Sequence, residues 1–405
     1  MTILERAVAP FLPFARPSIT DAEKRAVLAV LDSGWLTTGP IVREFEAAFA
    51  AFVSARHAVA VNSATAALHL ALDALGVRPG DEVIVPTWTF AASAEVVVYR
   101  GARPVLVDVD PATLNASIDA IVAAVTPRTR AVVAVHFAGL PDDIAGLVRE
   151  LEPRGVPVIE DAAHAFPSRL APDGRLAGTV GRVGAYSFYA TKTITTGEGG
   201  MLVTDDDGVA DRARLMALHG ISRDAWKRYS ESGSWYYEIE EAGYKYNLTD
   251  IAAALGLVQL GRGDELLDAR RRLHRRYVDA IAASSVGDLV ELPAGDGDPS
   301  HAWHLFVIRL HLDRLTIDRA AVMDELSRHR IGASVHFIPL HLHPYYRRRW
   351  GTTPEAFPVA THEYDRVISL PLWPGMSDAD VDRVVGALEA ILGAARRFTT
   401  HSRGE

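Results

Sequence analysis

The stretch Gly184-Ala-Tyr-Ser-Phe-Tyr-Ala-Thr-Lys192-Thr-Ile-Thr-Thr-Gly-Glu-Gly-Gly-Met-Leu-Val-Thr-Asp205 decides the fold expected for the rest of the chain. Two apolar runs, Ala185–Tyr189 and Met201–Thr204, flank a polar loop that holds one lysine, Lys192. Short buried strands joined by a Gly-rich turn have this pattern. An amine held in such a loop loses part of its solvation, which lowers its pKa and makes it a better nucleophile. This chemistry suits a Schiff base with a carbonyl compound.

Lysine is scarce in this chain, which draws attention to Lys192. The other lysines are Lys24, Lys227 and Lys245. The remaining strongly basic side chains are arginines, which stay protonated and form no useful imine. The alternative for Lys192 is an ordinary solvated loop lysine, and the residues at neighbouring strand ends decide between the two.

The composition is that of a globular protein of 405 residues, with 49% hydrophobic and 23% charged residues. No apolar run reaches the roughly 20 residues that span a bilayer, and the N-terminus lacks the pattern of a signal peptide. We therefore expect a cytoplasmic protein without a membrane partner. The absence of cysteine excludes disulfides and thiolate metal sites. The net charge of −9 argues against general nucleic-acid binding.

Strands and helices alternate along the first half of the chain. The strand candidates are continuous apolar runs, as expected when helices cover both faces of a mostly parallel sheet: Ala58–Val61, Glu82–Pro86, Pro104–Val109, Ala131–His136 and Pro157–Glu160. We predict a three-layer α/β large domain over 21–255, preceded by an arm over 1–20. A smaller α/β C-terminal domain follows over 256–405 and includes one long linking helix, Ile251 to about Ala283.

Ligands of such folds bind beyond the carboxyl ends of the strands, so the residues there are the candidates for a site. The first strand is followed by Ser63, Ala64 and Thr65, which open a helix; this is a phosphate site or an ordinary N-cap. The second is followed by Trp88, which either lies flat on an aromatic ligand or packs in the core.

The fifth strand is followed by Asp161 and His164. A carboxylate at this point either caps a helix or holds a proton on a pyridinium nitrogen. A candidate phosphate site, an aromatic side chain, a carboxylate and a lysine thus each follow a different predicted strand. Together they supply the contacts that pyridoxal phosphate needs.

Other cofactors find less support in the sequence. No Gly-x-Gly-x-x-Gly follows a strand, and the longer phosphate loop ending in Gly-Lys-[Ser/Thr] is absent as well. The histidines His336, His341 and His343 have neither a cysteine nor a carboxylate at helical spacing beside them, so we expect no metal.

With these motifs the chain resembles the DegT/DnrJ/EryC1/StrS sugar aminotransferases, a fold-type-I pyridoxal-phosphate family. The resemblance runs from about Phe14 to Leu392. It depends on the order and spacing of seven segments: Gly34–Pro40, Ser63–Leu68, Pro86–Ala91, Glu160–Ala165, Ser187–Gly200, Gly243–Asp250 and Gly332–His341.

The resemblance implies a role for each matching residue. Lys192 would form the Schiff base with the cofactor and then move the proton. Asp161 would pair with the ring nitrogen, His164 would lie near the ring's 3-oxygen, and Trp88 would stack on the ring. The phosphate would be bound by Ser63, Ala64, Thr65 and Ser187. An obligate homodimer with shared active sites is implied too, in which Lys245 or Asn247 reaches the partner's phosphate site.

The implied reaction transfers an amino group, from glutamate, to a nucleotide-linked keto-sugar. The run His336-Phe-Ile-Pro-Leu-His341 resembles members that act at C4 of a 4-keto-6-deoxyhexose more than those that act at C3. We expect the substrate to meet Thr38, His336, His341 and Tyr346. The alternatives are a C3 aminotransferase of the same family and a non-catalytic cofactor-binding sensor; the intact Lys192, Asp161 and His164 disfavour the sensor.

Overall fold

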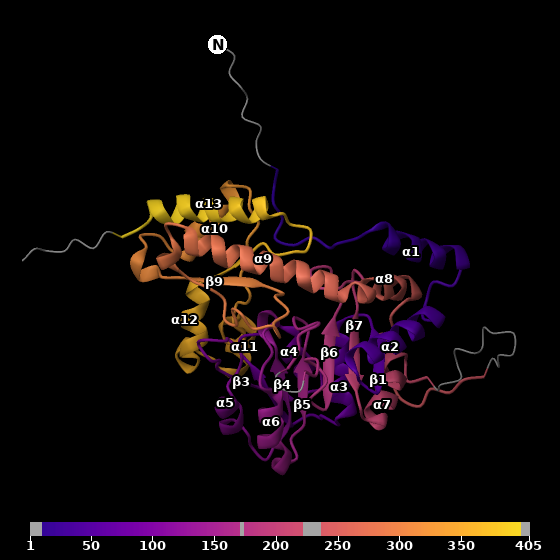
Figure 1. Cartoon of the computed structure of the whole chain (residues 1–405). Coiled ribbons are helices and arrows are strands. Elements are labelled where there is room, and N and C mark those ends of the chain that lie inside the picture. Colours follow the sequence, from indigo (N-terminus) through magenta and orange to yellow (C-terminus); the bar gives the residue numbers. More distant parts are fainter. Residues whose placement is uncertain (1–9, 171–173, 222–235, 398–405) are drawn as a thin grey trace, which may run out of the picture.

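The computed structural model describes residues 10–170, 174–221 and 236–397, which form a large sheet-based part and a smaller part joined along a long helix (Figure 1). Lys227 lies outside the described residues. Within them the larger sheet has seven strands in the order β1-β7-β6-β5-β4-β2-β3. In chain order these are β1 (His57–Val61), β2 (Glu82–Pro86), β3 (Arg103–Val107), β4 (Thr129–Val135), β5 (Val158–Asp161), β6 (Val183–Ser187) and β7 (Gly200–Thr204).

The sheet is mostly parallel, as predicted, and the exception is β7. This strand runs antiparallel to both β6 and β1 and lies between them, so it connects the first strand to the rest of the sheet. The predicted strands agree with the observed ones to within about two residues at each end, which is the usual scatter of strand boundaries. Two-residue differences occur at the end of β3, at the start of β4 and at both ends of β6.

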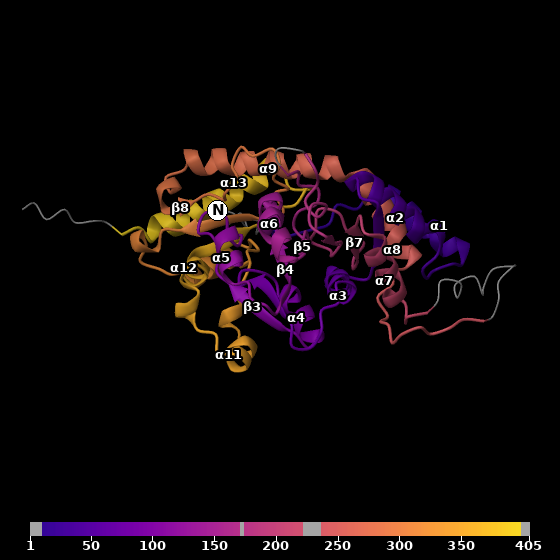
Figure 2. The ribbon, with the colours of Figure 1, turned by 90° about the horizontal axis from the view of Figure 1, so that it is seen from below.

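Side chains alternate between the two faces of the sheet because successive residues of a strand point in opposite directions. Val59 and Val61 face the core cluster beneath α3 (Ala64–Ala74), α4 (Ala92–Tyr99) and α7 (Asp207–Ala217), and β1 itself contacts α3 and α7. Ala58 and Ala60 face the other layer. That layer consists of α2 (Pro40–Val53), α5 (Ile118–Ala123), α6 (Ile144–Leu151) and α8 (Asp250–Gly261). Figure 2 shows α3 and α4 on one side of the strands and α6 and α2 on the other. The three-layer prediction is confirmed.

The predicted single linking helix is instead two helices, α8 and α9 (Gly263–Ala283), which meet at Arg262. Glycines flank Arg262, and glycine is a poor helix former. The Arg262 guanidinium donates to Glu23 of α1 (Asp21–Ser33) at 2.6 Å and to the Ser18 carbonyl oxygen at 3.1 Å. The break therefore places a cation where the N-terminal helix crosses the junction.

The smaller part has its own core around an antiparallel sheet of order β10-β9-β8. Its elements are β8 (Val290–Glu291), β9 (Phe306–Leu310), α10 (Arg319–Arg328), α11 (Pro344–Trp350), α12 (Pro358–Arg366), β10 (Val367–Leu370) and α13 (Asp378–Ala394). The N-terminal arm joins this part: the Leu12 amide donates to the Arg330 carbonyl at 2.9 Å, and the Gly332 amide donates back to Leu12 at 2.8 Å. The boundary at 255 stays a prediction.

None of the helices in the described ranges is long and apolar enough to cross a bilayer.

Candidate active site

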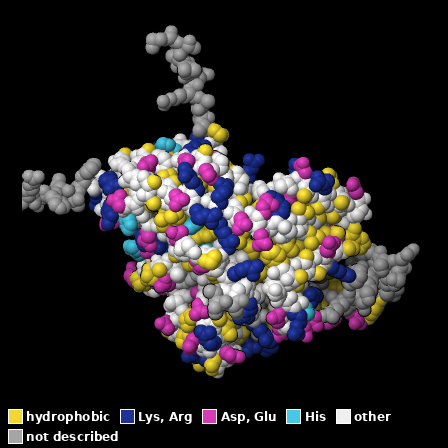
Figure 3. Space-filling model, in the orientation of Figure 1, with side chains coloured by type: hydrophobic (Ala, Val, Ile, Leu, Met, Phe, Trp, Pro, Cys, Tyr) yellow, Lys and Arg dark blue, Asp and Glu magenta, His cyan; other side chains and the backbone are white. Residues whose placement is uncertain are grey.

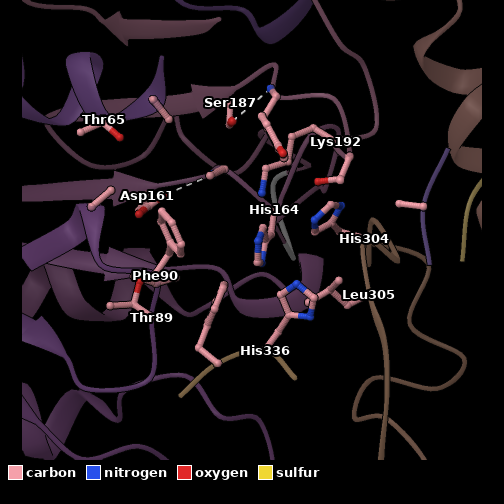
Figure 4. A pocket seen from close by; sticks show the side chains of 18 of the residues that line it. Thr65, Thr89, Phe90, Asp161, His164, Ser187, Lys192, His304, Leu305 and His336 are labelled. Carbon is pink, nitrogen blue, oxygen red and sulfur yellow. Dashed lines mark hydrogen bonds between the residues drawn. The ribbon is translucent and has the colours of Figure 1, made fainter. Parts of the chain in front are cut away.

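A cavity of about 560 Å³ opens at the carboxyl ends of the strands, between the large sheet and the smaller part. Its lining includes most of the predicted residues: Ser63, Ala64, Thr65, Asp161, His164, Ser187, Lys192 and His336. Figure 4 shows Lys192 with Asp161 and Thr65 to its left and the histidines below and to its right. Sequence positions more than a hundred residues apart thus converge at one edge of the sheet, where the strand-end rule places ligands.

The N-terminus of α3 forms one end of the cavity, the expected phosphate end. The Ser63 side chain accepts from the Ala66 amide at 3.1 Å, so this residue is the N-cap, and the amides that follow it are exposed at the positive end of the helix. Gly200 of β7 runs directly beneath it, where an added Cβ would lie 2.4 Å from the Ser63 carbonyl carbon. Position 200 therefore requires a glycine. The unpaired amides at the start of α3 favour binding of a phosphate at this helix end.

Asp161 ends β5, and its position is fixed by its neighbours. Glu160 points to the opposite face and accepts from the amides of Gly178, Val180 and Gly181 and from the His136 ring. Asp161 itself is 7% exposed, and burial raises its pKa, which hydrogen bonds to its oxygens oppose. A buried carboxylate at this place is suited to hold a cationic N–H, because the attraction within the ion pair offsets the free-energy cost of removing the carboxylate from water.

Lys192 reaches the cavity from the loop between β6 and β7. Burial lowers its pKa to about 8, although nearby Asp161 favours its charged form. An amine with this pKa is partly neutral at physiological pH and can attack a carbonyl carbon. The predicted nucleophile is therefore in a suitable environment and opposite the predicted carboxylate.

Three histidines, His164, His304 and His336, line the wall near Lys192. The His164 and His304 rings lie 4.3 Å apart between centroids, and His336 stacks on Phe14 at 5.3 Å. Burial lowers the pKa of all three, and the charge of Lys192 adds to the effect; His336 falls to about 4. All three are thus neutral imidazoles at pH 7.

The prediction that Trp88 stacks on the cofactor ring is wrong in this structure. Trp88 is fully buried in a core cluster with Phe137, whose ring meets it edge-on at 6.1 Å, and it does not line the cavity. Two residues on, Phe90 is 63% exposed and lines the cavity, with its ring 6.0 Å from that of Phe337. The alternative of core packing holds for Trp88, and Phe90 is one of the aromatic side chains that line the cavity instead.

The predicted substrate contacts of His341 and Tyr346 are wrong as well. His341 is fully buried, and its ring nitrogens lie 2.8 Å from the Thr87 hydroxyl and 3.0 Å from the Thr361 hydroxyl. Tyr346 is 3% exposed and stacks on Trp350 within the core. Neither side chain lines the cavity, so both have structural roles.

Thr38, Lys245 and Asn247 lie together but outside the lining of this cavity. The Asn247 side-chain amide donates to the Thr38 hydroxyl at 2.7 Å, which in turn donates to the Leu248 carbonyl at 2.5 Å. Lys245 is exposed. Their expected contact with a partner subunit stays a prediction.

Several lining residues were missed by sequence reasoning: Phe14, Phe90, Glu198 and His304. Phe90 and Glu198 stand inside the motifs quoted above, next to residues that were chosen. Phe14 belongs to the arm and His304 precedes β9. Neither carries a local signal, because only the packing of the smaller part brings them to the cavity.

This donor set fits pyridoxal 5'-phosphate. A helix N-terminus with the Ser187 hydroxyl would bind the phosphate, Asp161 the ring nitrogen, Phe90 one ring face and Lys192 the aldehyde carbon. The fold and the site together define a fold-type-I pyridoxal-phosphate protein. The chain belongs to the DegT/DnrJ/EryC1/StrS aminotransferase family, whose model matches residues 17–389.

Known relatives span nearly the whole chain. The spore coat polysaccharide biosynthesis protein SpsC of Bacillus subtilis is 47% identical over 386 residues, 95% of this chain and 98% of SpsC. Spr1654 of Streptococcus pneumoniae, in its PLP form, superposes with a TM-score of 0.86 at 32% identity, covering 95% of this chain and 99% of that one. DesI, solved in the presence of its TDP-sugar product, superposes with a TM-score of 0.82 at 34% identity, covering 95% of this chain and 93% of DesI.

Proposed function

We propose that this protein transfers an amino group from glutamate to a nucleotide-linked keto-sugar, at C4 of a 4-keto-6-deoxyhexose. The observation that carries the proposal is the convergence of Lys192 and Asp161 on one cavity whose opposite end is a helix N-terminus. The resemblance to DesI, solved with a TDP-sugar product, supports a nucleotide sugar as acceptor. The motif that ends at His341 supports C4 over C3.

Bound pyridoxal phosphate supplies an aldehyde that carries the amino group and a ring that withdraws electrons from the reacting carbon. Asp161 would hold the proton on the ring nitrogen, and its buried position would exclude water from that pair. Lys192 would take the proton from the substrate carbon and return it to the cofactor carbon on the other side of the shared nitrogen, a transfer for which a pKa near 8 is well matched. The aromatic side chains of Phe14, Phe90 and Phe337 shield the reacting atoms from solvent.

A homodimer is part of the proposal. Figure 3 shows apolar side chains gathered over α1 and α8. Leu28 and Leu31 of α1 are 55% and 46% exposed, and Leu36 in the turn after α1 is 44% exposed. Patches of this kind mark interaction surfaces. The exposed Lys245 and the pair Asn247–Thr38 would then face the partner's phosphate site. Sedimentation of the purified protein tests this: a monomer at micromolar concentration contradicts it.

The proposed reaction is tested by incubating the yellow holoenzyme with glutamate and then with a nucleotide-linked 4-keto-6-deoxyhexose. We expect loss of the yellow colour in the first step and a new amine at C4, located by NMR, in the second. A new amine at C3 would support the alternative within the family. Indifference of the spectrum to every amino acid would favour the cofactor-binding sensor.

Lys192→Ala is the matched control for this reaction. The variant should retain the circular dichroism spectrum of the wild type and lose turnover, because no other lysine among the described residues lines the cavity. Near-normal turnover would remove Lys192 from the mechanism.

A further inference from the structure

The imidazoles of His164 and His304 are unusual for buried polar groups. Their exposed fractions are 9% and 5%, yet neither ring forms a hydrogen bond with any residue in the described ranges, and the Nδ1 atom of each is buried without a partner. Most buried polar side chains in native proteins are hydrogen-bonded, so each exception calls for an explanation. Both rings line the cavity, and the Nε2 atom of each also lacks a hydrogen-bond partner among the described residues but is not fully buried, so Nε2 is the ring nitrogen that a ligand in the cavity can reach.

His304 lies on the far side of Lys192 from the phosphate end. In Figure 4, Thr65 is at the left, His304 at the right, and the end of the Lys192 side chain is between them. A substrate that reacts at Lys192 must extend away from the phosphate-binding turn, and this direction leads to His304.

The charges of the lining select the kind of group that His304 meets. In the described part of the chain no arginine lines the cavity, and Lys192 is the cation there. An amino acid donor brings an α-carboxylate to the same carbon that reacts. Because Lys192 is occupied by the chemistry, the hydrogen-bond donors left to the carboxylate include the three imidazoles and the hydroxyls of Tyr189, Thr191 and Ser334, and among these the ring of His304 has no hydrogen-bond partner in the described residues. Neutral His304 offers one N–H and one lone pair.

The backbone holds His304 firmly in place. Its amide donates to the Ala138 carbonyl at 2.9 Å, and its carbonyl accepts from Nη1 of Arg270 at 3.1 Å. Arg270 is fully buried and also donates to the carbonyl of Leu372, a second residue of the lining, at 3.0 Å. At Gly139 an added Cβ would lie 3.1 Å from the His304 amide nitrogen, so the backbone at Gly139 is packed closely against that of His304. The ring is therefore pre-organised to receive a ligand.

We propose that His304 is a substrate-contact residue that donates a hydrogen bond to the α-carboxylate of the amino donor. This inference rests on the proposed function, since it assumes an amino acid donor. It assigns His304 to the amino donor, whereas His336 is expected to contact the sugar.

The test compares His304→Leu with the wild-type holoenzyme, and His304→Asn serves as a second variant that keeps an N–H donor. For His304→Leu we expect the KM for glutamate to rise about tenfold or more, as for loss of a hydrogen bond to a charged group. The KM for the nucleotide keto-sugar should change less than about twofold, and His304→Asn should recover part of the loss. His362→Asn, a histidine on the surface with 73% side-chain exposure, is the control.

A binding measurement complements the kinetics. Glutarate, a dicarboxylate without an amine, should bind the His304→Leu holoenzyme about tenfold more weakly than the wild type in calorimetry. Unchanged glutamate KM and glutarate affinity in a folded variant, or a rise confined to the sugar KM, would overturn this inference alone. If no amino acid bleaches the wild type, the proposed function falls and this inference with it.

Discussion

The hydroxyl of Ser93 donates a hydrogen bond of 2.7 Å to Oδ2 of Asp161, and both side chains are buried. The same hydroxyl lies 2.7 Å from that of Thr89, and the Ala163 amide donates to Oδ1 of Asp161 at 3.2 Å. Burial raises the pKa of Asp161, whereas the bond from Ser93 lowers it. Ser93 thus favours the ionised form of the carboxylate against the effect of burial and fixes the position of Oδ2.

Removing this hydroxyl tests that role. Ser93→Ala should weaken binding of pyridoxal phosphate to the cofactor-free protein by about tenfold, because one hydrogen bond to a charged group is lost. Titration followed by absorbance measures the affinity. Ser93→Thr keeps the hydroxyl and should bind nearly as well, and Ser117→Ala, which removes the cap of α5, is the control. Equal affinities for the wild type and Ser93→Ala would contradict the assignment.

The rate at which the cofactor attaches should depend on pH through Lys192. Burial lowers the pKa of this amine to about 8 from an ordinary value of 10.5. Only the neutral amine attacks the aldehyde, so the attachment rate should rise as pH increases and level off above about pH 8. Stopped-flow absorbance between pH 6.5 and about 9.5 measures this. A rate that keeps rising toward pH 10.5 would show an amine that burial does not perturb.

Truncation of Trp88 should lower stability, whereas truncation of Phe90 should weaken cofactor binding. Trp88→Ala leaves a cavity in a closed core and should lower the free energy of unfolding by about 3–5 kcal/mol. Phe90→Ala alters a side chain that is 63% exposed, so stability should change by less than about 1 kcal/mol. It should instead weaken cofactor binding by about tenfold through loss of ring stacking. Urea unfolding and cofactor titration separate the two, and the reverse pattern would restore the stacking role of Trp88.

Glu23 should make the protein sensitive to acid. Burial would raise its pKa, but hydrogen bonds from Thr20 and Arg262 outweigh that effect and lower it to about 2. Because this folded-state pKa lies below the ordinary 4.5, the stabilisation is complete above about pH 4.5 and is lost as pH falls toward 2. Glu23→Gln should therefore cost roughly 2–3 kcal/mol at pH 7 and progressively less in acid.

Denaturant unfolding of Glu23→Gln at pH 7, 4 and 3 measures this difference, with Glu265→Gln, the exposed partner of Arg262, as control. A difference from the wild type that does not shrink between pH 4 and 3 would contradict the assigned pKa.

Much of the large sheet was predictable because its strands are covered on both faces and so appear as unbroken apolar runs. Lys192, Asp161 and Ser63 were predictable because each lies at or after the carboxyl end of a predicted strand, and these ends converge at one edge of the sheet. The break at Arg262 was missed because the apolar periodicity continues across it, and only the flanking glycines mark the interruption.

Other features depend on information that no local pattern carries. The direction of Trp88 is set after β2 has ended at Pro86, where the alternation of strand side chains no longer applies. The burial of His341 depends on hydroxyls of Thr87 and Thr361, which are distant in sequence. His304 enters the site only because the smaller part packs against the turn at Ala138. Contacts between separate parts of a chain have no signature in either part alone.

The position of β7 has a consequence for synthesis on the ribosome. β1 is an edge strand whose neighbour in the sheet is β7, with His57 paired to Thr204, so a nascent chain that has not yet delivered Gly200 leaves β1 without a hydrogen-bonding neighbour. Loop closure over such a long separation is slow, and unpaired strands are prone to aggregate. The pairing of β7 with β1 therefore brings the N-terminal end of α3 and the loop that carries Lys192 together in one late event, before the smaller part has emerged to close the other wall of the cavity.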